Sequence, residues 1–212
     1  MIKEVAITLV TVAVMLPMIS EPVFANVAVG LTVGEYAWAG AGTNGGWQFT
    51  VNEPIIVTHL GLFDEWPDGF KIDHPIGLWR LSDEVLLASG TMSAGTGDPL
   101  LDEFRYIDVP DVALDVDVDY VIGIYSESCD YPNADKVILK ADDLQINPAI
   151  DIVVRRWDIA GQFQMPANIY EWDPYGGEPY YPNYFGPNFQ FIPEPGTVLL
   201  LGMGGLLLRR RK

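Results

Sequence analysis

The sequence predicts an all-β protein, an antiparallel β-sandwich of jelly-roll type. Short runs rich in branched and aromatic residues recur along the chain, and turn residues separate them. No segment between residues 26 and 192 keeps the 3.6-residue period of an amphipathic helix. The 212 residues include 21 glycines and 16 prolines, which is typical of a chain with many turns. The length favours one domain with short segments at its ends.

The first two expected strands show the pattern most clearly. Trp47–Val51 alternates large apolar and polar residues, as a strand with one buried face does. Asn52–Pro54 supplies turn residues, and Ile55–Phe63 is a second apolar run. Pro67–Gly69 marks the next turn.

Six further runs continue the series towards the C-terminus, with turn signals between them. They are Ile76–Leu81, Val85–Ser93, Phe104–Val109, Tyr120–Tyr125, Ile150–Trp157 and Phe189–Phe191. Many short strands of this kind favour two antiparallel sheets packed face to face.

The N-terminal segment is typical of a secretory signal peptide. An apolar stretch over residues 5–18 is followed by small and branched residues at the point where signal peptidase cleaves. Cleavage is expected between Ala25 and Asn26, which makes residues 1–25 a signal helix outside the fold. The alternative is an ordinary buried helix or strand.

The C-terminal segment has three parts in order: the triplet Pro193, Glu194 and Pro195, the apolar run Thr197–Leu208, and the cations Arg209, Arg210, Arg211 and Lys212. The prolines keep the chain extended, the apolar run can enter lipid, and the cations stay on the cytoplasmic side. A run of 12 residues makes about 18 Å of helix, against a hydrocarbon core of about 30 Å. We therefore expect transient retention in the inner membrane. A resident single-pass membrane protein is the alternative.

This order of parts resembles the PEP-CTERM sorting domain of bacteria, which is also catalogued as an ice-binding-protein C-terminal domain. The resemblance implies export, recognition by the membrane-embedded cysteine protease exosortase, and cleavage near the Pro-Glu-Pro triplet. It also implies delivery to the cell surface or to an extracellular matrix that contains exopolysaccharide. The body shows no repeated threonine ladder that would match an ice lattice.

The body is similar to a domain of unknown function that is common in PEP-CTERM proteins. The similarity rests on segments in a fixed order: Gly46–Asp64, His74–Trp79, Leu86–Leu100, Phe104–Val109, Asp119–Tyr125 and Tyr184–Phe191. It implies a β-sandwich and no established activity. The usual Ala-Gly turn before the Tyr-Val-Ile-Gly strand is replaced by Asp115–Asp119, so the resemblance does not imply the conformation of that loop.

The charge balance argues against nucleic acid as a partner. Lys and Arg number 12 against 29 Asp and Glu, a formal net charge of −17, which repels phosphate backbones. Cys129 is the only cysteine, so an intrachain disulfide framework is excluded.

The residues predict no enzyme. The two histidines, His59 inside an apolar strand and His74 before Pro75, have no nucleophile or metal-binding motif beside them. Asp130 follows Cys129 and disfavours the thiolate that a nucleophile needs. No cofactor is expected, apart from the calcium considered next.

Five aspartates, Asp108, Asp111, Asp115, Asp117 and Asp119, fall within twelve positions. At period two the last three would share one face of an extended segment, where carboxylates suit calcium. No glycine bends the cluster into a cage, and a solvated acidic loop is the alternative.

Aromatic residues suggest a glycan contact. Residues 170–184 hold five tyrosines and a tryptophan, and the candidate contacts there are Tyr170, Trp172, Tyr175 and Tyr180. Trp66, next to Pro67, is expected to be exposed and is a further candidate. Flat amphipathic rings stack on sugar faces. Alternatively, residues 170–184 are a loop whose rings cover the edge of the sandwich.

The sequence thus predicts a signal peptide (1–25), a β-sandwich (26–192) and a sorting tail (193–212). Signal peptidase and exosortase are the expected processing enzymes. The function expected is a non-enzymatic structural or binding module at the surface or in the matrix, associated with polysaccharide. The alternatives are a calcium-dependent adhesive domain and a secreted hydrolase.

Overall fold

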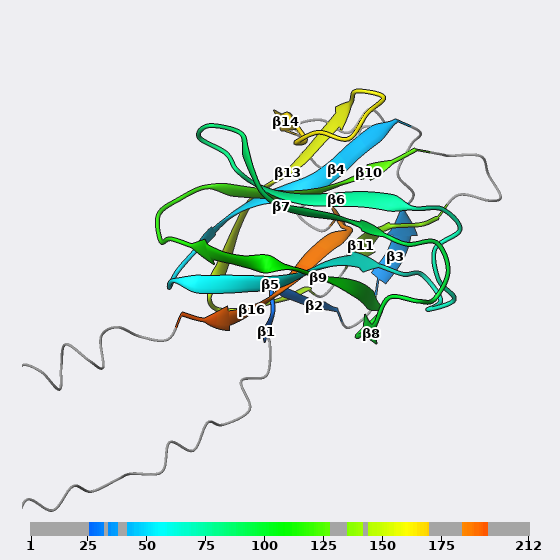
Figure 1. The fold of residues 1–212 in the computed structure, drawn as a ribbon, viewed down its shortest axis with the longest axis horizontal. Helices are drawn as coiled ribbons and strands as arrows, with labels where there is room; N and C mark the ends of the chain where they lie inside the picture. The colour runs from blue at the N-terminus through cyan, green and yellow to red at the C-terminus, as the bar shows by residue number, and fades with distance from the viewer. Residues whose placement is uncertain are drawn as a thin grey trace, which may run out of the picture.

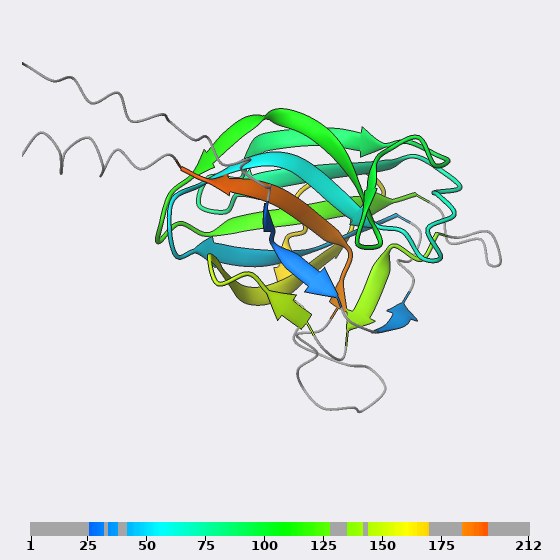
Figure 2. The same ribbon diagram turned by 90° about the horizontal axis from the view of Figure 1, so that it is seen from below.

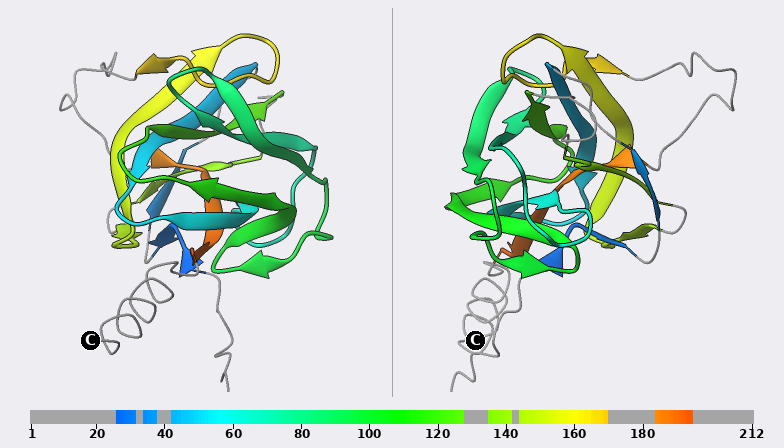
Figure 3. Two further views of the ribbon diagram at one scale, coloured as in Figure 1. Left: turned by 60° about the vertical axis from the view of Figure 1, so that its left-hand side comes forward. Right: turned by 90° about the vertical axis from the view of Figure 1, so that its right-hand side faces the viewer.

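The fold is a sandwich of two antiparallel sheets (Figure 1, Figure 3). The computed structural model describes residues 26–31, 34–37, 42–127, 135–141, 144–169 and 184–194. Every regular element in this part of the chain is a strand, so the predicted all-β class is confirmed. The predicted signal helix and C-terminal apolar helix lie outside the described residues. Within the described ranges no helix is long and apolar enough to cross a membrane.

One layer is a six-stranded sheet. In spatial order its strands are β14 (Asn168–Ile169), β13 (Ile150–Ile159), β4 (Thr43–Val51), β10 (Tyr120–Ser126), β6 (His74–Arg80) and β7 (Val85–Met92). All pairs are antiparallel, and Gly46 of β4 lies directly opposite Gly123 of β10.

The other layer is a five-stranded sheet. In spatial order its strands are β1 (Asn26–Val27), β16 (Pro187–Pro193), β5 (Ile55–Phe63), β9 (Phe104–Leu114) and β8 (Leu100–Leu101). The last described strand, β16, therefore lies inside the sheet, between the first strand and β5 (Figure 2).

Two small sheets complete the described elements. One has the order β15 (Tyr184–Phe185), β11 (Ile138–Ala141) and β3 (Gly34–Ala37), and the other pairs β12 (Leu144–Ile146) with β2 (Val29–Leu31). All eight strands predicted from the sequence are present, most of them extended by one to five residues at an end. The short strands β1, β2, β3, β8, β11, β12, β14 and β15 were not predicted.

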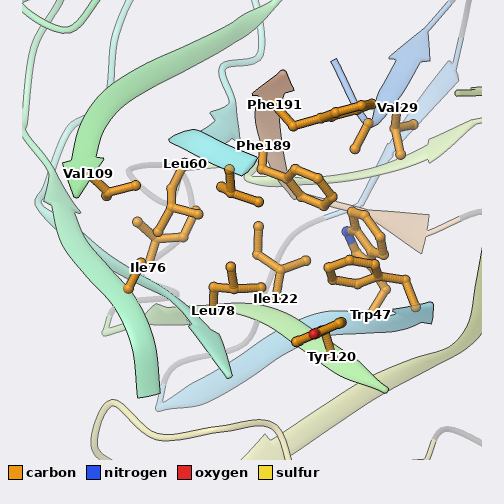
Figure 4. Close-up of a cluster of buried hydrophobic side chains, with 14 of the residues drawn as sticks. Val29, Trp47, Leu60, Ile76, Leu78, Val109, Tyr120, Ile122, Phe189 and Phe191 are labelled. Carbon is orange, nitrogen blue, oxygen red and sulfur yellow. The ribbon is translucent and has the colours of Figure 1, made fainter. Parts of the chain in front are cut away.

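The core lies between the two large sheets. Trp47 and Ile122 of the six-stranded sheet face Phe189 and Phe191 of β16 (Figure 4). The ring of Phe49 packs against that of Phe189 with centroids 5.0 Å apart. The rings of Trp47 and Phe189 stack with their centroids 5.8 Å apart. Trp47 also donates a hydrogen bond from Nε1 to the carbonyl oxygen of Pro187, at 2.8 Å. The last described strand is thus anchored in the centre of the sandwich.

The six-stranded sheet is covered on its outer face too, which corrects the prediction of one buried face for Trp47–Val51. Gln48 points away from the core but is buried, and Arg156 donates two hydrogen bonds to its Oε1. Farther along the sheet, Met165 and Phe163 of the segment after β13 pack on Trp79 and Val121. Alternating polarity along a strand therefore did not reveal this second, smaller apolar layer.

Candidate functional site

The chain turns sharply after β5 through residues 64–69, which we call the Trp66 loop. Asp64 is buried directly after the strand, and both its carboxylate oxygens accept hydrogen bonds from the N–H of Gly69, at 3.2 and 3.1 Å. Gly69 has φ of 92°, and a Cβ there would meet the backbone of Gly95. A side chain at position 69 is therefore incompatible with this turn.

Arg105, on the neighbouring strand β9, fixes the Trp66 loop from inside. Its Nε donates to Asp64 Oδ2 at 2.7 Å, and the two side chains are 4% and 2% exposed. Its Nη2 donates to the carbonyl oxygen of Pro67 at 3.2 Å. Its Nη1 donates to the carbonyl oxygens of Thr96 and Asp98, at 3.2 and 2.8 Å. One buried guanidinium thus holds two surface loops together.

The Trp66 side chain stands at the outside of this clamped loop. It is 70% exposed, as the sequence predicted, and its backbone has φ of 70°. A left-handed conformation costs a bulky residue on the order of 1–2 kcal/mol. Such strain is found where the surrounding structure enforces it, often at ligand-binding positions. Here the hydrogen bonds of Arg105 to Asp64 and to the carbonyl oxygen of Pro67 hold the loop on either side of Trp66.

A small pocket of about 60 Å³ opens beside the Trp66 ring. Its lining includes the carboxylates of Asp64, Glu65, Asp68 and Asp135. Glu65 accepts a hydrogen bond from Lys136 Nζ at 2.7 Å. Burial raises the pKa of Asp64 above its usual value, and the hydrogen bond from Arg105 only partly opposes this. Ligand pockets measure about 300–1,000 Å³, so this pocket is too small to enclose a ligand of that class.

Asp135 forms the inner wall of the pocket through a buried polar cluster. It accepts hydrogen bonds from the backbone N–H groups of Lys71 and Ile72, and His74 Nε2 lies 2.9 Å from its Oδ2. The other ring nitrogen of His74, Nδ1, is buried and has no hydrogen-bond partner in the described part of the chain. Burial raises the pKa of Asp135, but these hydrogen bonds outweigh burial and leave the pKa below its usual 3.8.

The lowered pKa of Asp135 predicts a specific loss of stability in acid. Below pH 3.8 the unfolded chain binds a proton at Asp135 while the folded chain resists it, so the free energy of unfolding falls as the pH drops. The variant Asp135→Asn should lose less stability than the wild type between pH 5 and pH 3, measured by urea unfolding. Asp111→Asn, at an exposed position on β9, is the matched control. An equal loss in Asp135→Asn and wild type would contradict the assignment.

A second and larger hollow, of about 300 Å³, lies on the outer face of the five-stranded sheet. Its lining includes His59, Asp108, Gln190, Leu101 and Ile107. Asp98, whose carbonyl oxygen Arg105 binds, also lies in its lining. The same guanidinium therefore supports both this hollow and the Trp66 loop.

His59 makes its contacts at the irregularity that separates Val57 from His59 in the β5–β9 pairing. Its Nε2 lies 2.8 Å from Asp108 Oδ1, and its Nδ1 lies 2.9 Å from Thr58 Oγ1. The carboxylate side chain of Asp108 is 92% exposed. In a catalytic triad the carboxylate is buried and orients the imidazole. This arrangement lacks that feature and is suited to hydrogen bonding a polar ligand.

Residues 115–119 form a turn between β9 and β10, which corrects the extended segment that the calcium prediction assumed. Asp117 has φ of 62°, and Asp119 accepts a hydrogen bond from Gln48 Nε2 at 2.7 Å. The turn removes the period-two spacing that would put Asp115, Asp117 and Asp119 on one face. Among the described residues no group of three or more His, Cys, Asp or Glu is placed to hold a metal ion. Calcium binding stays a prediction.

Several predicted site residues lie outside the described residues. They are Ala25, Tyr170, Trp172, Tyr175, Tyr180, Pro195, Arg209, Arg210 and Arg211. Cys129, which the sequence disfavours as a nucleophile, also lies outside them. Asn26, the expected first residue after signal cleavage, begins β1. The buried Asp64–Arg105 pair and the His59–Asp108 hollow were not predicted, because each joins residues more than 40 positions apart.

The C-terminal end of the sandwich is a paired strand. In the β16–β5 ladder Ile192 lies opposite Ile56, and Pro193 lies opposite Ile55. The N–H of Glu194 donates to the carbonyl oxygen of Pro54 at 3.0 Å. Pro193 and Glu194 are exposed, and Phe191 before them is buried.

Comparison with known families places a signal on this same strand end. Residues 191–212 match the PEP-CTERM protein-sorting motif. The chain carries a PEP-CTERM sorting motif. It is therefore an exported protein that exosortase sorts, and the motif is a C-terminal sorting signal that anchors the chain in the membrane. A search of curated proteins found no match. The resemblance of the body to a β-sandwich domain common in PEP-CTERM proteins is consistent with the all-β fold.

Proposed function

We propose that the sandwich is a non-enzymatic binding module that acts at the cell surface or in the extracellular matrix and contacts polysaccharide through the Trp66 loop. The observation that supports the proposal is the exposed Trp66 ring, held in a left-handed backbone conformation beside a polar pocket. A loop whose backbone is fixed in advance loses less entropy when its exposed aromatic side chain binds. The hydroxyl groups of a sugar stacked on the ring would find carboxylates at the pocket rim.

The carboxylates of the pocket support a binding role over hydrolysis. A glycoside hydrolase needs two carboxyl groups that reach the substrate, one as acid and one as base or nucleophile. Here Asp64 is bound to Arg105, Glu65 to Lys136, and Asp135 to His74 and two backbone N–H groups. The fourth carboxylate of the lining, Asp68, is exposed, and one such group falls short of the two that hydrolysis needs. The three engaged carboxylates hold the loop in shape, which supports a structural part for them in a binding surface.

The charge of the chain favours particular polysaccharides. With a formal net charge of −17, the protein repels polymers rich in uronic acid or sulfate. Neutral polysaccharides, or those with amine-bearing sugars, are therefore the proposed ligands. Attraction between opposite charges would speed association with the amine-bearing class.

Substitution of Trp66 tests the proposal. We expect Trp66→Gly to weaken binding to a neutral or amine-bearing polysaccharide about tenfold or more, because truncation of an aromatic anchor costs at least about 1.4 kcal/mol of binding. The free energy of unfolding should stay within about 1 kcal/mol of the wild type, because relief of the left-handed strain offsets the greater entropy that glycine loses. Affinity electrophoresis or a glycan array on the exported protein measures polysaccharide binding, and urea unfolding measures the free energy of unfolding.

A matched control removes a second exposed apolar side chain. Ile159, on β13, is 67% exposed and lies outside the lining of the pocket beside Trp66. Ile159→Ala should bind as the wild type does. Equal binding by Trp66→Gly and wild type, or no binding of the wild type to any polysaccharide tested, would reject the proposal.

A further inference from the structure

Three polar side chains form a row across the outer face of the five-stranded sheet, which we call the polar row. Gln190 of β16 lies opposite His59 of β5, and His59 lies opposite Asp108 of β9 (Figure 1). The residue that follows each of them is in the core: Phe191, Leu60 and Val109. Because successive side chains of a strand point to opposite faces, the three polar side chains point away from the core. With about 4.8 Å between neighbouring strands, the polar row is about 10 Å long.

A β-bulge in β5 gives His59 its direction. Val57 and Leu60 are both in the core, although side chains three positions apart face opposite ways in a regular strand. Both ladders of β5 shift register at this point, so Thr58 is an extra residue in the strand. Thr58 Oγ1 lies 2.9 Å from His59 Nδ1 and helps to hold the ring. Bulges re-aim side chains and are frequent beside active sites, so the polar row lies at a position typical of function.

Asp108 is the exposed end of the polar row. Its side chain is 92% exposed, and its Oδ1 lies 2.8 Å from His59 Nε2. A carboxylate only accepts hydrogen bonds, so Nε2 is the donor in this pair. An ionised carboxylate has about four lone-pair sites, and His59 occupies one of them. Asp108 can therefore accept hydrogen bonds from a ligand while His59 holds it in place.

The hollow of about 300 Å³ described above lies over the polar row, since all three of its residues line it. Gln190 is 9% exposed and brings to the lining an amide, which can both donate and accept. Pro99 and Leu101, the latter 43% exposed, add an apolar wall. The volume is at the lower end of the range of ligand pockets, which combine apolar walls with a few placed polar groups. A sugar ring, with apolar C–H faces and polar edges, fits such a lining.

The charge of the hollow favours a cationic ligand. Asp98 and Asp108 both line it, and among the described residues of the lining there is no lysine or arginine. The Asp98 carboxylate accepts a hydrogen bond from the N–H of Ser93 at 2.8 Å, and Arg105 donates to the Asp98 carbonyl oxygen at 2.8 Å, so this residue is held in place. An ammonium group forms charge-assisted hydrogen bonds to carboxylates that are about twice as strong as those of a neutral hydroxyl.

We propose that the hollow binds one sugar unit that carries a free amino group, with the ammonium group at Asp108, a hydroxyl group at Gln190 and the C–H face of the ring against Leu101. The inference rests on the proposed function for the class of polymer, but it uses a site of its own and not the Trp66 loop. It selects the amine-bearing polysaccharides from the two classes proposed above. Acetylation of the amino group removes its charge, so the acetylated sugar loses the charge-assisted bond.

Calorimetric titration with a short glucosamine oligomer tests the inference. The exported protein carries Trp66→Gly, which removes the ring of the Trp66 loop, so that the remaining binding is assigned to the hollow. We expect the oligomer with free amino groups to bind at least about tenfold more tightly than its N-acetylated form. Equal affinities for the two forms, or binding of neither, would overturn the inference.

Asp108→Asn, in the same background, identifies the group that binds the amine. Asparagine keeps an oxygen that accepts from His59 but carries no charge. We expect affinity for the free-amine oligomer to fall about tenfold, to the level of the N-acetylated form.

Asp111→Asn is the matched control for Asp108→Asn, because it removes the same charge from an exposed position on β9 outside the lining. Its affinity should stay within about twofold of the background protein, since distant surface charges are screened. Urea unfolding should give both variants the midpoint of the background protein. Unchanged affinity in Asp108→Asn, or an equal loss in Asp111→Asn, would overturn the inference.

The wild type separates this inference from the proposed function. If the wild type binds the free-amine oligomer and Trp66→Gly does not, the hollow is not a binding site, and the proposal for the Trp66 loop stands. If Trp66→Gly binds as the wild type does and Asp108→Asn loses binding, the hollow is the site, and the proposal for the Trp66 loop fails.

Discussion

The substitution Gly46→Ala is expected to lower the free energy of unfolding by more than about 4 kcal/mol, or to abolish folding of the exported domain. Gly46 lies in the middle of β4, directly opposite Gly123 of β10. A Cβ at position 46 would overlap the carbonyl oxygen of Ile122 and lie 2.7 Å from the Cα of Gly123. These are backbone atoms of the central strand pair, so no rotamer change can make room.

The size of this effect follows from where the clash falls. Overpacking against a flexible side chain typically costs about 1–3 kcal/mol, because the side chain can move. Here β4 and β10 would have to separate, and β4 also pairs with β13 on its other side. Domains have only about 5–15 kcal/mol of stability in total, so the variant should be found unfolded or degraded.

Gly97→Ala is the matched control for Gly46→Ala. No atom lies within 4 Å of a Cβ built at Gly97, and its φ is not in the left-handed range. Alanine should therefore be tolerated there, or raise the melting temperature slightly by restricting the unfolded chain. Circular dichroism with thermal unfolding measures both variants. A melting temperature for Gly46→Ala within about 2 or 3 degrees of wild type would show that β4 and β10 do not pair in this register.

The sequence allowed the main strands to be predicted because alternation and turn chemistry are local signals. Ile55–Phe63 and Tyr120–Tyr125 are long enough for their patterns to be recognised. Strands such as β1 and β8 have two residues each, which is too few to show a period of two. Their pairing depends on the partner strand already being in place, and this is a property of the tertiary fold.

The candidate site likewise combines a feature that local sequence predicts with one that depends on the tertiary fold. Exposure of Trp66 was predictable, since Pro67 and Asp68 mark a surface turn. The clamp that holds the loop was not predicted, because Arg105 joins Asp64 across 41 positions. A weak signal was present: a basic residue between the large aromatics Phe104 and Tyr106 at the start of the strand indicates a buried ion pair.

Arg105→Met is expected to destabilise the domain by about 3–5 kcal/mol, because it leaves the carboxylate of Asp64 buried without its partner. Three backbone carbonyl groups, those of Pro67, Thr96 and Asp98, also lose their donors. The Trp66 loop should then lose its fixed shape, so polysaccharide binding should weaken together with stability. Chemical unfolding and the binding assay measure the two effects.

The dependence on pH separates a buried unpaired charge from a simple loss of packing. Burial already raises the pKa of Asp64 in the wild type, and removal of Arg105 removes the groups that lower it. The folded variant should therefore bind a proton at Asp64 over a wider range above 3.8, and its stability should rise relative to the wild type as the pH falls through that range. The gap in unfolding free energy should be largest at neutral pH and narrow towards pH 4.

Arg80→Met provides the comparison that decides between these causes. Arg80 forms an ion pair with Asp83 at 2.7 Å, but their side chains are 41% and 44% exposed. Water replaces such a partner readily, so the unfolding midpoint of this variant should match the wild type at both pH values. If Arg105→Met cost no more stability than Arg80→Met, the guanidinium would not be holding the two loops, and the rigid presentation of Trp66 would need another cause. If the difference in unfolding free energy between Arg105→Met and the wild type stayed the same at neutral pH and at pH 4, the destabilisation would come from lost packing alone.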